Sequence, residues 1–146
     1  MAETTKVRLR VISRMTDEQG QTFETKNARH GTLVSSGEML VLEYDDEQEG
    51  ERAHIALTME KGCSAAENRV QMKRTGMTSG VLSFLPGRRT PSVYVTIYGE
   101  IPIQIDTRRV LIVNEQENGG GLQLEYDVYM GGERTSSAKL DITWRC

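Results

Sequence analysis

Hydrophobic and polar residues alternate with a period of two along most of the chain, which is typical of strands that bury one face. In the clearest run, Leu122, Leu124, Tyr126, Val128 and Met130 share one face. A second run follows directly, in which Ala138, Leu140, Ile142 and Trp144 alternate with polar residues. Gly131-Gly132 lies between the two runs and suits a tight hairpin, so we expect two antiparallel neighbours whose register over residues 135–137 stays open.

Shorter runs of the same kind predict further strands along the rest of the chain. They cover residues 7–11, 39–44, 53–60, 92–98, 101–106 and 110–113. Gly99-Glu100 is expected as a bend, Thr107-Arg108-Arg109 as a break, and residues 45–51 and 114–121 as loops. Pro102 indicates an edge position or a bulge. Turn signals at intervals of roughly 8 to 12 residues predict about nine to eleven short strands, and therefore a barrel or a sandwich.

One segment fits either a helix or a strand. Ser64 and Glu67 have the spacing of a helix capping box, and Ala65, Ala66 and Val70 can line a short helix through Arg74. Alternatively, a loop runs to Asn68 and a strand follows from Arg69 to Arg74. We favour the strand, because the surrounding sequence has strand periodicity and natural sequences tend to be locally consistent.

Length and composition indicate one soluble domain over residues 1–146. Hydrophobic residues are 37% and charged residues 27% of the chain, which excludes a disordered or membrane-like composition. The formal net charge is −3, so we expect no nucleic-acid partner. The apolar stretches are far shorter than the ~20 residues of a membrane helix, and no signal peptide is visible at the start of the chain, so we expect a cytoplasmic protein and no membrane partner.

The sequence lacks the patterns of metal and redox sites. Cys63 and Cys146 are isolated, without a CxxC motif or a Cys/His cluster, and are expected to be reduced and unpaired. Asp45-Asp46-Glu47 lacks the ligand spacing of a calcium loop. We therefore expect no metal and no cofactor.

Catalytic signals are also weak. Gly76-Met77-Thr78-Ser79-Gly80 resembles a nucleophile elbow, but a strand-like segment follows it, so a hairpin turn is expected. Glu125 and Asp127 lie ~7 Å apart on one strand face, a spacing that some acid/base pairs use, but we interpret them as a solvated outer face. His54 is interpreted as a surface or lining residue. The pairs Arg88-Arg89 and Arg108-Arg109 have the charge to contact phosphate but are interpreted as solvated surface residues. No catalytic residue is predicted, and we expect a protein that is not an enzyme.

Several segments, in order and spacing, resemble the YwiB-like family of small bacterial proteins. They are Arg74-Thr75-Gly76-Met77-Thr78-Ser79, Leu82-Ser83-Phe84, Tyr94-Val95-Thr96-Ile97-Tyr98-Gly99, Leu124-Glu125-Tyr126-Asp127 and Gly131-Gly132-Glu133. One difference is Ile97, where the family usually has proline. The resemblance implies an all-β fold, a single antiparallel calycin-like or lipocalin-like barrel of about eight to ten strands with little helix. It also implies a cytoplasmic bacterial setting and no established activity.

A closed sheet of this size has an interior for side chains or one small ligand. Three functions remain open: a barrel that binds a small apolar or amphipathic ligand, a packed interaction module without a ligand, and an enzyme at the barrel mouth. The oligomeric state is also open.

If a ligand binds inside, the candidate residues are Arg74, Tyr94, Thr96 and Tyr98, since the last three share one strand face. An unpaired arginine in a cavity calls for an anion, so the expected ligand is a small amphipathic or anionic molecule such as a fatty acid. Alternatively, these tyrosines and the threonine decorate the outer face, and Val93, Val95 and Ile97 form the core face.

Overall fold

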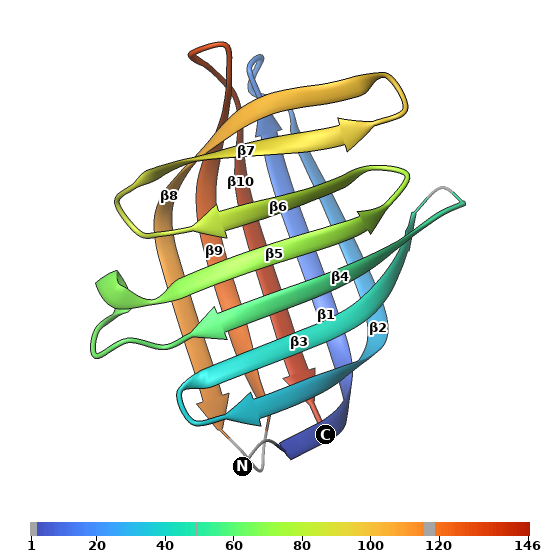
Figure 1. Cartoon of the computed structure of the whole chain (residues 1–146), viewed down its shortest axis with the longest axis vertical. Coiled ribbons are helices and arrows are strands. Elements are labelled where there is room, and N and C mark those ends of the chain that lie inside the picture. Colours follow the sequence, from blue (N-terminus) through green and yellow to red (C-terminus); the bar gives the residue numbers. More distant parts are fainter. Residues whose placement is uncertain (1–2, 49, 116–118) are drawn as a thin grey trace.

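The fold is a closed antiparallel β-barrel (Figure 1). The computed structural model describes residues 3–48, 50–115 and 119–146. In this part of the chain ten strands and one short 3₁₀ helix form. The strands are β1 (Glu3–Asp17), β2 (Thr22–Ser36), β3 (Met39–Gln48), β4 (Glu51–Glu60), β5 (Arg69–Gly76), β6 (Ser79–Phe84), β7 (Arg89–Thr96), β8 (Gly99–Glu115), β9 (Gly119–Met130) and β10 (Glu133–Arg145). The helix η1 spans Ala65–Glu67.

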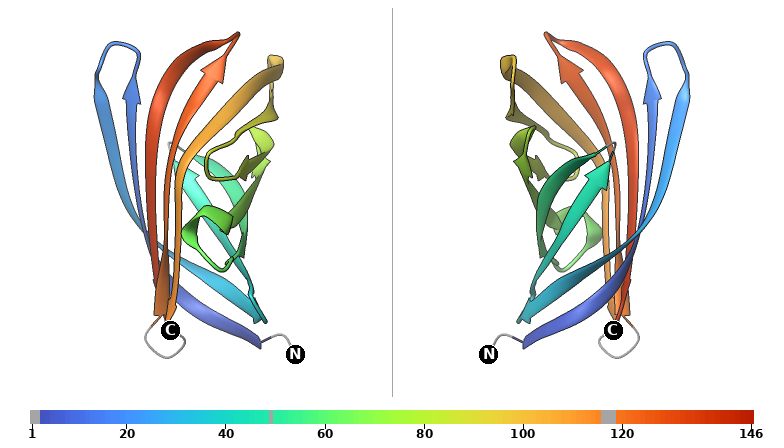
Figure 2. Two further views of the ribbon diagram at one scale, coloured as in Figure 1. Left: turned by 90° about the vertical axis from the view of Figure 1, so that its left-hand side faces the viewer. Right: turned by 90° about the vertical axis from the view of Figure 1, so that its right-hand side faces the viewer.

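Each strand pairs with the next one in the chain, and β1 pairs with β10 to close the ring. This last ladder runs from Arg8 opposite Arg145 to Asp17 opposite Ser136. Figure 2 shows that β1, β2, β8, β9 and β10 run along most of the height of the barrel. The strands β3 to β7 cross the other side at a steep angle to them (Figure 1). Closure leaves every strand with one face inside and one outside.

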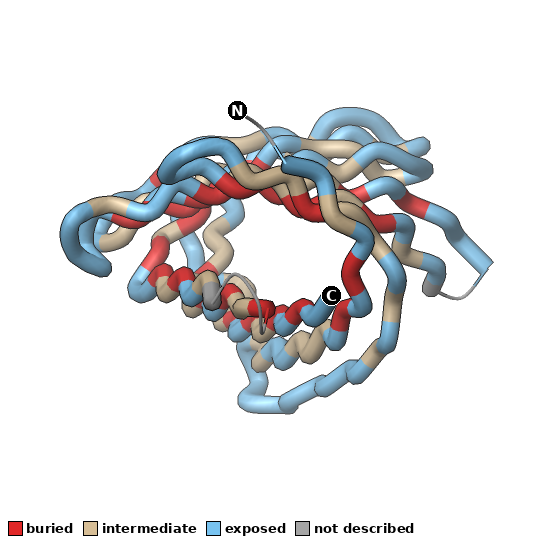
Figure 3. The backbone as a smooth tube through the Cα atoms, turned by 90° about the horizontal axis from the view of Figure 1, so that it is seen from below, coloured by how far each residue is buried: buried red, intermediate tan, exposed pale blue. Residues whose placement is uncertain are grey.

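Inward side chains fill the lower part of the barrel, near the two termini. The largest fully buried ones are Trp144, Phe84, Leu42, Leu57, Met59, Ile105, Leu122, Leu124 and Ile142. Viewed from below, buried positions recur along the strands around the closed ring (Figure 3). Burial of each such side chain stabilises the fold by roughly 1.5 to 3 kcal/mol. Every strand except β7 contributes a buried hydrophobic residue to this layer, and Tyr94 of β7 packs against it.

The all-β prediction and the two C-terminal strands are confirmed. Gly131 and Gly132 have φ of 59° and 83°, as a two-residue turn with the twist of a hairpin requires. The register shifts between Arg134 and Ser136, within the stretch left open by the sequence. The prediction of a strand after Asn68 is confirmed by β5, and the competing helix is limited to the three residues of η1. No helix in the described ranges is long and apolar enough to cross a membrane.

The predicted break at Thr107-Arg108-Arg109 is wrong. β8 continues through it, with a register shift between Thr107 and Arg109 where it pairs with β9. The reason is visible in the sequence: Ile103 and Ile105 occupy odd positions, whereas Val110 and Ile112 occupy even ones, and all four are buried. A one-residue bulge keeps both sets on the inner face of one strand.

Other strand boundaries also differ from the predicted ones. β3 continues to Gln48 and β4 starts at Glu51, so most of the predicted loop at 45–51 is strand. In the other predicted loop, at 114–121, residues 116–118 lie outside the described residues. β7 ends at Thr96, two residues earlier than predicted, and the turn precedes Gly99. β2 was not predicted, because its inward positions include Thr25, Asn27 and Arg29 and hide the alternation.

Pro102 lies at a local edge of the sheet, which is one of the two positions predicted for it. It pairs with Val93 of β7, while the ladder between β8 and β9 starts only at Gln104. Proline has no N–H to donate, but at this position β8 has no second neighbouring strand that would accept such a hydrogen bond.

Substitution of Leu140 with aspartate tests the face assigned to β10. Leu140 is buried and Ile142, on the same face, is fully buried, so Leu140→Asp places an unpaired charge in the interior. We expect a loss of several kcal/mol in the free energy of unfolding, measured by chemical denaturation. Thr143→Asp, on the exposed outer face, is the matched control and is expected to change stability by less than ~0.5 kcal/mol. Equal stability of the two variants would contradict the assigned face.

Replacement of both cysteines tests the prediction that neither is structural. Cys63 and Cys146 are exposed and carry free thiols. The double variant Cys63→Ser/Cys146→Ser is expected to keep the melting temperature of the wild type in reducing buffer, measured by calorimetry. A drop of several degrees would show a packing role that their exposure does not indicate.

Candidate functional site

The inward face changes from apolar to polar toward the upper end of the barrel. On β1, Val7 and Leu9 are buried in the core, whereas Ser13 lines a cavity above it. Thr25 and Asn27 of β2 also line this cavity, which has a volume of about 270 Å³. Polar groups are rare inside a barrel unless they have a partner, so this end is the candidate site.

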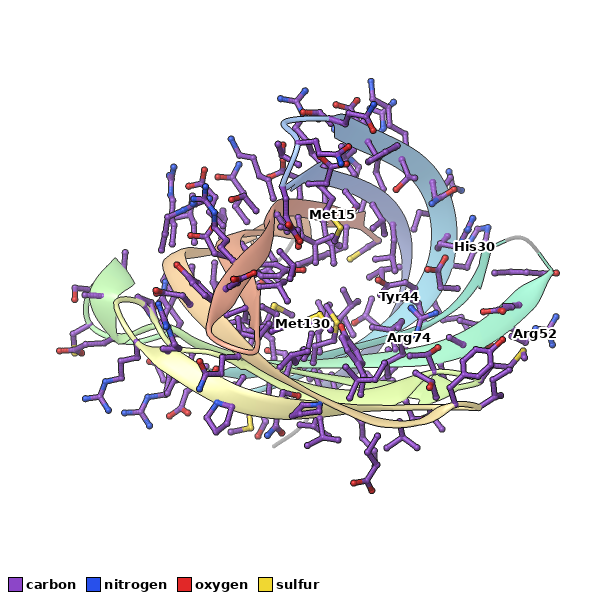
Figure 4. All side chains as sticks on the ribbon, turned by 90° about the horizontal axis from the view of Figure 1, so that it is seen from above. Met15, His30, Tyr44, Arg52, Arg74 and Met130 are labelled. Atoms are coloured by element: carbon purple, nitrogen blue, oxygen red, sulfur yellow. The ribbon has the colours of Figure 1, made fainter. Side chains whose placement is uncertain are left out.

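Arg74 is the central residue of the cavity. It points inward from β5, where it lies opposite Ile55 of β4 and Gly80 of β6 (Figure 4). Its Nε atom is buried and has no hydrogen-bond partner. Among the described residues, its guanidinium forms no ion pair either. Since arginine keeps its charge at all accessible pH values, this donor is paired only if an acceptor enters the cavity.

A glycine leaves room beside Arg74. Gly80 lies between Arg74 and Tyr94 in one inner row across three strands. A Cβ atom built on Gly80 would lie 2.9 Å from Cδ1 of Tyr94, so the tyrosine ring occupies the space that a side chain would fill. Neighbouring strands are ~4.8 Å apart, so the backbones of Arg74 and Tyr94 are separated by two strand spacings, with Gly80 between them.

Three tyrosines give the cavity neutral hydrogen-bonding groups. Burial raises the pKa of Tyr44, Tyr94 and Tyr126 above the ordinary value, so all three remain protonated at neutral pH. Arg74 lines the same cavity as Tyr44 and Tyr94, and its charge opposes this increase in pKa at both tyrosines. The site thus combines one cation with hydroxyl groups that both donate and accept.

The carboxylate that lines the cavity is engaged by another arginine. Asp46 of β3 forms an ion pair with Arg29 of β2, with 3.0 Å between Oδ1 of the aspartate and the nearest guanidinium nitrogen. The Nε atom of Arg29 donates to the same oxygen at 3.1 Å. Because this pair is already formed, Asp46 balances Arg29 and leaves the charge of Arg74 uncompensated.

The four residues predicted from the sequence fall into two groups. Arg74 and Tyr94 both line the cavity. Thr96, the last residue of β7, instead donates through its hydroxyl to the carbonyl of Gly99 at 3.0 Å. The interior placement of Tyr98 is wrong: it lies in the turn after β7 and is 92% exposed. The alternative, with the valines of β7 in the core, is also wrong, since Val93 and Val95 are exposed.

Six polar cavity residues were missed from the sequence: Ser13, Thr25, Asn27, Tyr44, Asp46 and Tyr126. Tyr44 shares a face with Leu40 and Leu42 in the predicted strand 39–44, and extension of that strand past residue 44 would have placed Asp46 on the same face. Asn27 belongs to β2, a strand that was not predicted because its residues lack a clear alternation.

The outer carboxylates are less solvated than expected. Asp127 is buried at 8% exposure; its Oδ1 accepts from Arg108 at 2.8 Å and from Ser137 at 2.7 Å. The bulge in β8 brings Arg108 to this position. Glu125 is half-buried and lies 3.6 Å from Lys139. Both carboxylates thus serve as partners in ion pairs on the outer wall, and no acid/base pair is formed.

His54 lies on the exposed outer face of β4 between two carboxylates of β3. Its Nδ1 atom lies 2.8 Å from Asp45 and its Nε2 atom 3.3 Å from Glu43. Hydrogen bonds to Asp45 and then to Glu43 raise the pKa of the imidazole. Within the described ranges, no group of three side chains is arranged to hold a metal ion.

Comparison with protein families identifies the chain. A model of a domain of unknown function, DUF1934, matches residues 9–142. The chain belongs to the DUF1934 family. The fold of this DUF1934 protein is similar to the crystal structure of the ywiB protein from Bacillus subtilis, with a TM-score of 0.81 and 20% sequence identity over 97% of this chain and 92% of that one. Comparison with curated proteins gave no match. The resemblance stated from sequence is therefore confirmed for family and barrel fold.

Removal of His54 tests the ion pairs of the outer face. Because its pKa is raised in the folded state, its contribution to stability is fully present below the unfolded pKa of ~6.5 and is lost as the pH rises through the folded pKa. We expect His54→Gln to lower the melting temperature slightly at pH 5.5 and to have no effect at pH 9, the pair being exposed. In a Glu43→Gln/Asp45→Asn background this pH dependence should vanish; its persistence would contradict the assignment.

Proposed function

We propose that this protein is a non-enzymatic barrel that binds a small amphipathic anion in its upper end. The observation that carries the proposal is the buried, unpartnered Nε atom of Arg74 inside a cavity. A cation held without a partner in a partly apolar site is unfavourable, and an anionic group of a ligand removes the penalty. The bacterial and cytoplasmic setting implied by the family resemblance is part of this proposal.

The cavity walls indicate the rest of the ligand. Met72, Leu82 and Leu140 contribute apolar surface, and Tyr94 and Tyr126 add aromatic rings with hydroxyl groups. The volume of about 270 Å³ lies at the lower limit of small-molecule sites. A carboxylic acid with a short or medium alkyl chain therefore fits better than a long-chain fatty acid.

A panel of fatty acids tests the proposal by thermal stabilisation. Ligand at 100 times its dissociation constant stabilises the folded protein by roughly 2.7 kcal/mol, and this raises the melting temperature. We expect octanoate to stabilise the wild type and octanol to do so much less, since the alcohol lacks the charge that Arg74 requires. Arg74→Met should abolish the response to octanoate.

The matched control is Arg69→Met, which removes an exposed arginine from the outer face of the same strand. It should respond to octanoate as the wild type does. Without ligand, Arg74→Met should be at least as stable as the wild type, because it removes an uncompensated charge. If no acid stabilises the wild type, or if Arg74→Met responds equally, the proposal fails.

A second candidate, an interaction module, is favoured by one observation. The outer wall exposes Val81 of β6 together with Val93 and Val95 of β7, side chains that a solvent-facing strand does not require. Native mass spectrometry of gently purified protein separates the candidates, because a retained small molecule supports the first and a ligand-free dimer supports the second.

A further inference from the structure

A second group of basic side chains lies on the outside of the barrel, centred on Arg8 of β1. Arg145 of β10 and His30 of β2 are its direct cross-strand neighbours. Lys6 and Arg10 are its neighbours on β1, and all five side chains are exposed. We call these residues the Arg8 cluster. Figure 4 shows His30 on the outside of the ring, away from Arg74.

The Arg8 cluster is electrostatically unfavourable in the free protein. Arg8 and Arg145 are like charges directly opposite each other on the sheet, an arrangement that destabilises it. Other outer cations, such as Arg14 and Lys139, have carboxylate partners within 4 Å. In the described part of the chain, no residue of the Arg8 cluster forms an ion pair. A ligand with several negative charges would relieve this repulsion, whereas a single carboxylate would leave most of it.

A groove adjoins the cluster. It has a volume of about 610 Å³ and runs over the outer face of β1, β10, β9 and β8, with Arg10 and Arg145 among its lining residues. Ile12, Leu111 and Val113 give it apolar walls. Gly121 lies between Thr143 and Val113 in the register and adds no side chain, so the floor is open at this point.

Asp141 of β10 also lines the groove and carries an acceptor without a partner. Oδ1 of Asp141 is buried and has no hydrogen-bond partner. The amide side chain of Gln123 lies directly across the ladder from it. Asp141 is four residues from Arg145 along β10, which is roughly 13 Å at the rise of a strand. A molecule that satisfies both ends therefore carries phosphates at one end and hydrogen-bond donors on a flat apolar body at the other.

We propose that this outer face binds a nucleotide, with its phosphates on the Arg8 cluster and its base in the groove against Asp141. Guanidinium groups bind phosphate oxygens in bidentate geometry. A carboxylate accepts hydrogen bonds from the exocyclic amino group of a base. The net charge of −3 on the whole chain repels a long polyanion, so a free nucleotide is favoured over a nucleic-acid strand.

Binding measurements at low salt test both halves of the site on the full chain. We expect CTP to bind more tightly than inorganic triphosphate, which lacks the base, and than cytidine, which lacks the phosphates. Arg8→Gln should weaken CTP binding about tenfold or more, and Asp141→Asn should remove most of the preference for CTP over UTP. Arg134→Gln, an exposed arginine at the other end of β10, is the matched control and should bind as the wild type does.

Two further measurements show that Arg8→Gln is folded and that the outer site is separate from the cavity of Arg74. Arg8→Gln should melt no lower than the wild type at low salt, because it relieves repulsion. Arg74→Met should still bind CTP, since the interior cavity is a separate site.

An oligocytidylate distinguishes a free nucleotide from a nucleic-acid strand as the ligand. If it binds no more tightly than CTP, the ligand is a free nucleotide; if it binds much more tightly, the ligand is a single strand. Absence of CTP binding to the wild type, or equal binding by Arg8→Gln, overturns the proposal, and equal binding of triphosphate overturns the base site.

Discussion

Closure of the sheet by the ladder between β1 and β10 is the constraint on which the other features depend. It gives each strand an inner face and limits the volume available there. Near the termini, large apolar side chains such as Trp144 and Phe84 are buried in that volume. At the upper end, the same constraint confines Arg74 in a cavity without a partner. A bound ligand with a negative charge would explain why the fold holds an unpaired cation in its interior.

The same ladder creates the cationic group on the outside. Arg8 and Arg145 come from opposite ends of the chain and become direct neighbours only because the ring closes in this register. The inner and outer groups differ in what they can hold. Arg74 is half-buried among tyrosines and suits one charge on a small apolar body, whereas the exposed Arg8 cluster suits several charges. The two proposed sites are therefore independent and lie on opposite faces of the wall.

The strands and part of the inner site could be predicted because their signal is local. The alternation around Leu124 and Leu140 and the Gly131-Gly132 turn are each contained within a few residues. Arg74 was identified through a motif, and Tyr94 through its position in a run of alternating residues. The bulge at Arg108, the exposed turn at Tyr98 and the burial of Asp127 were not predicted, because each depends on a neighbouring strand. The Arg8 cluster needs the full register and could not be read from one segment.

The most direct test of an interior anion site is the NMR signal of the side-chain Nε–H of Arg74 during titration with octanoate. The account predicts that this resonance shifts, that its exchange with water slows, and that Tyr94 and Tyr126 shift with it, because the carboxylate then occupies the empty acceptor position. The corresponding signal of Arg69, on the outer face of the same strand, should not move. An unchanged Arg74 signal at saturating octanoate, or larger shifts on the outer wall than in the cavity, would contradict the account.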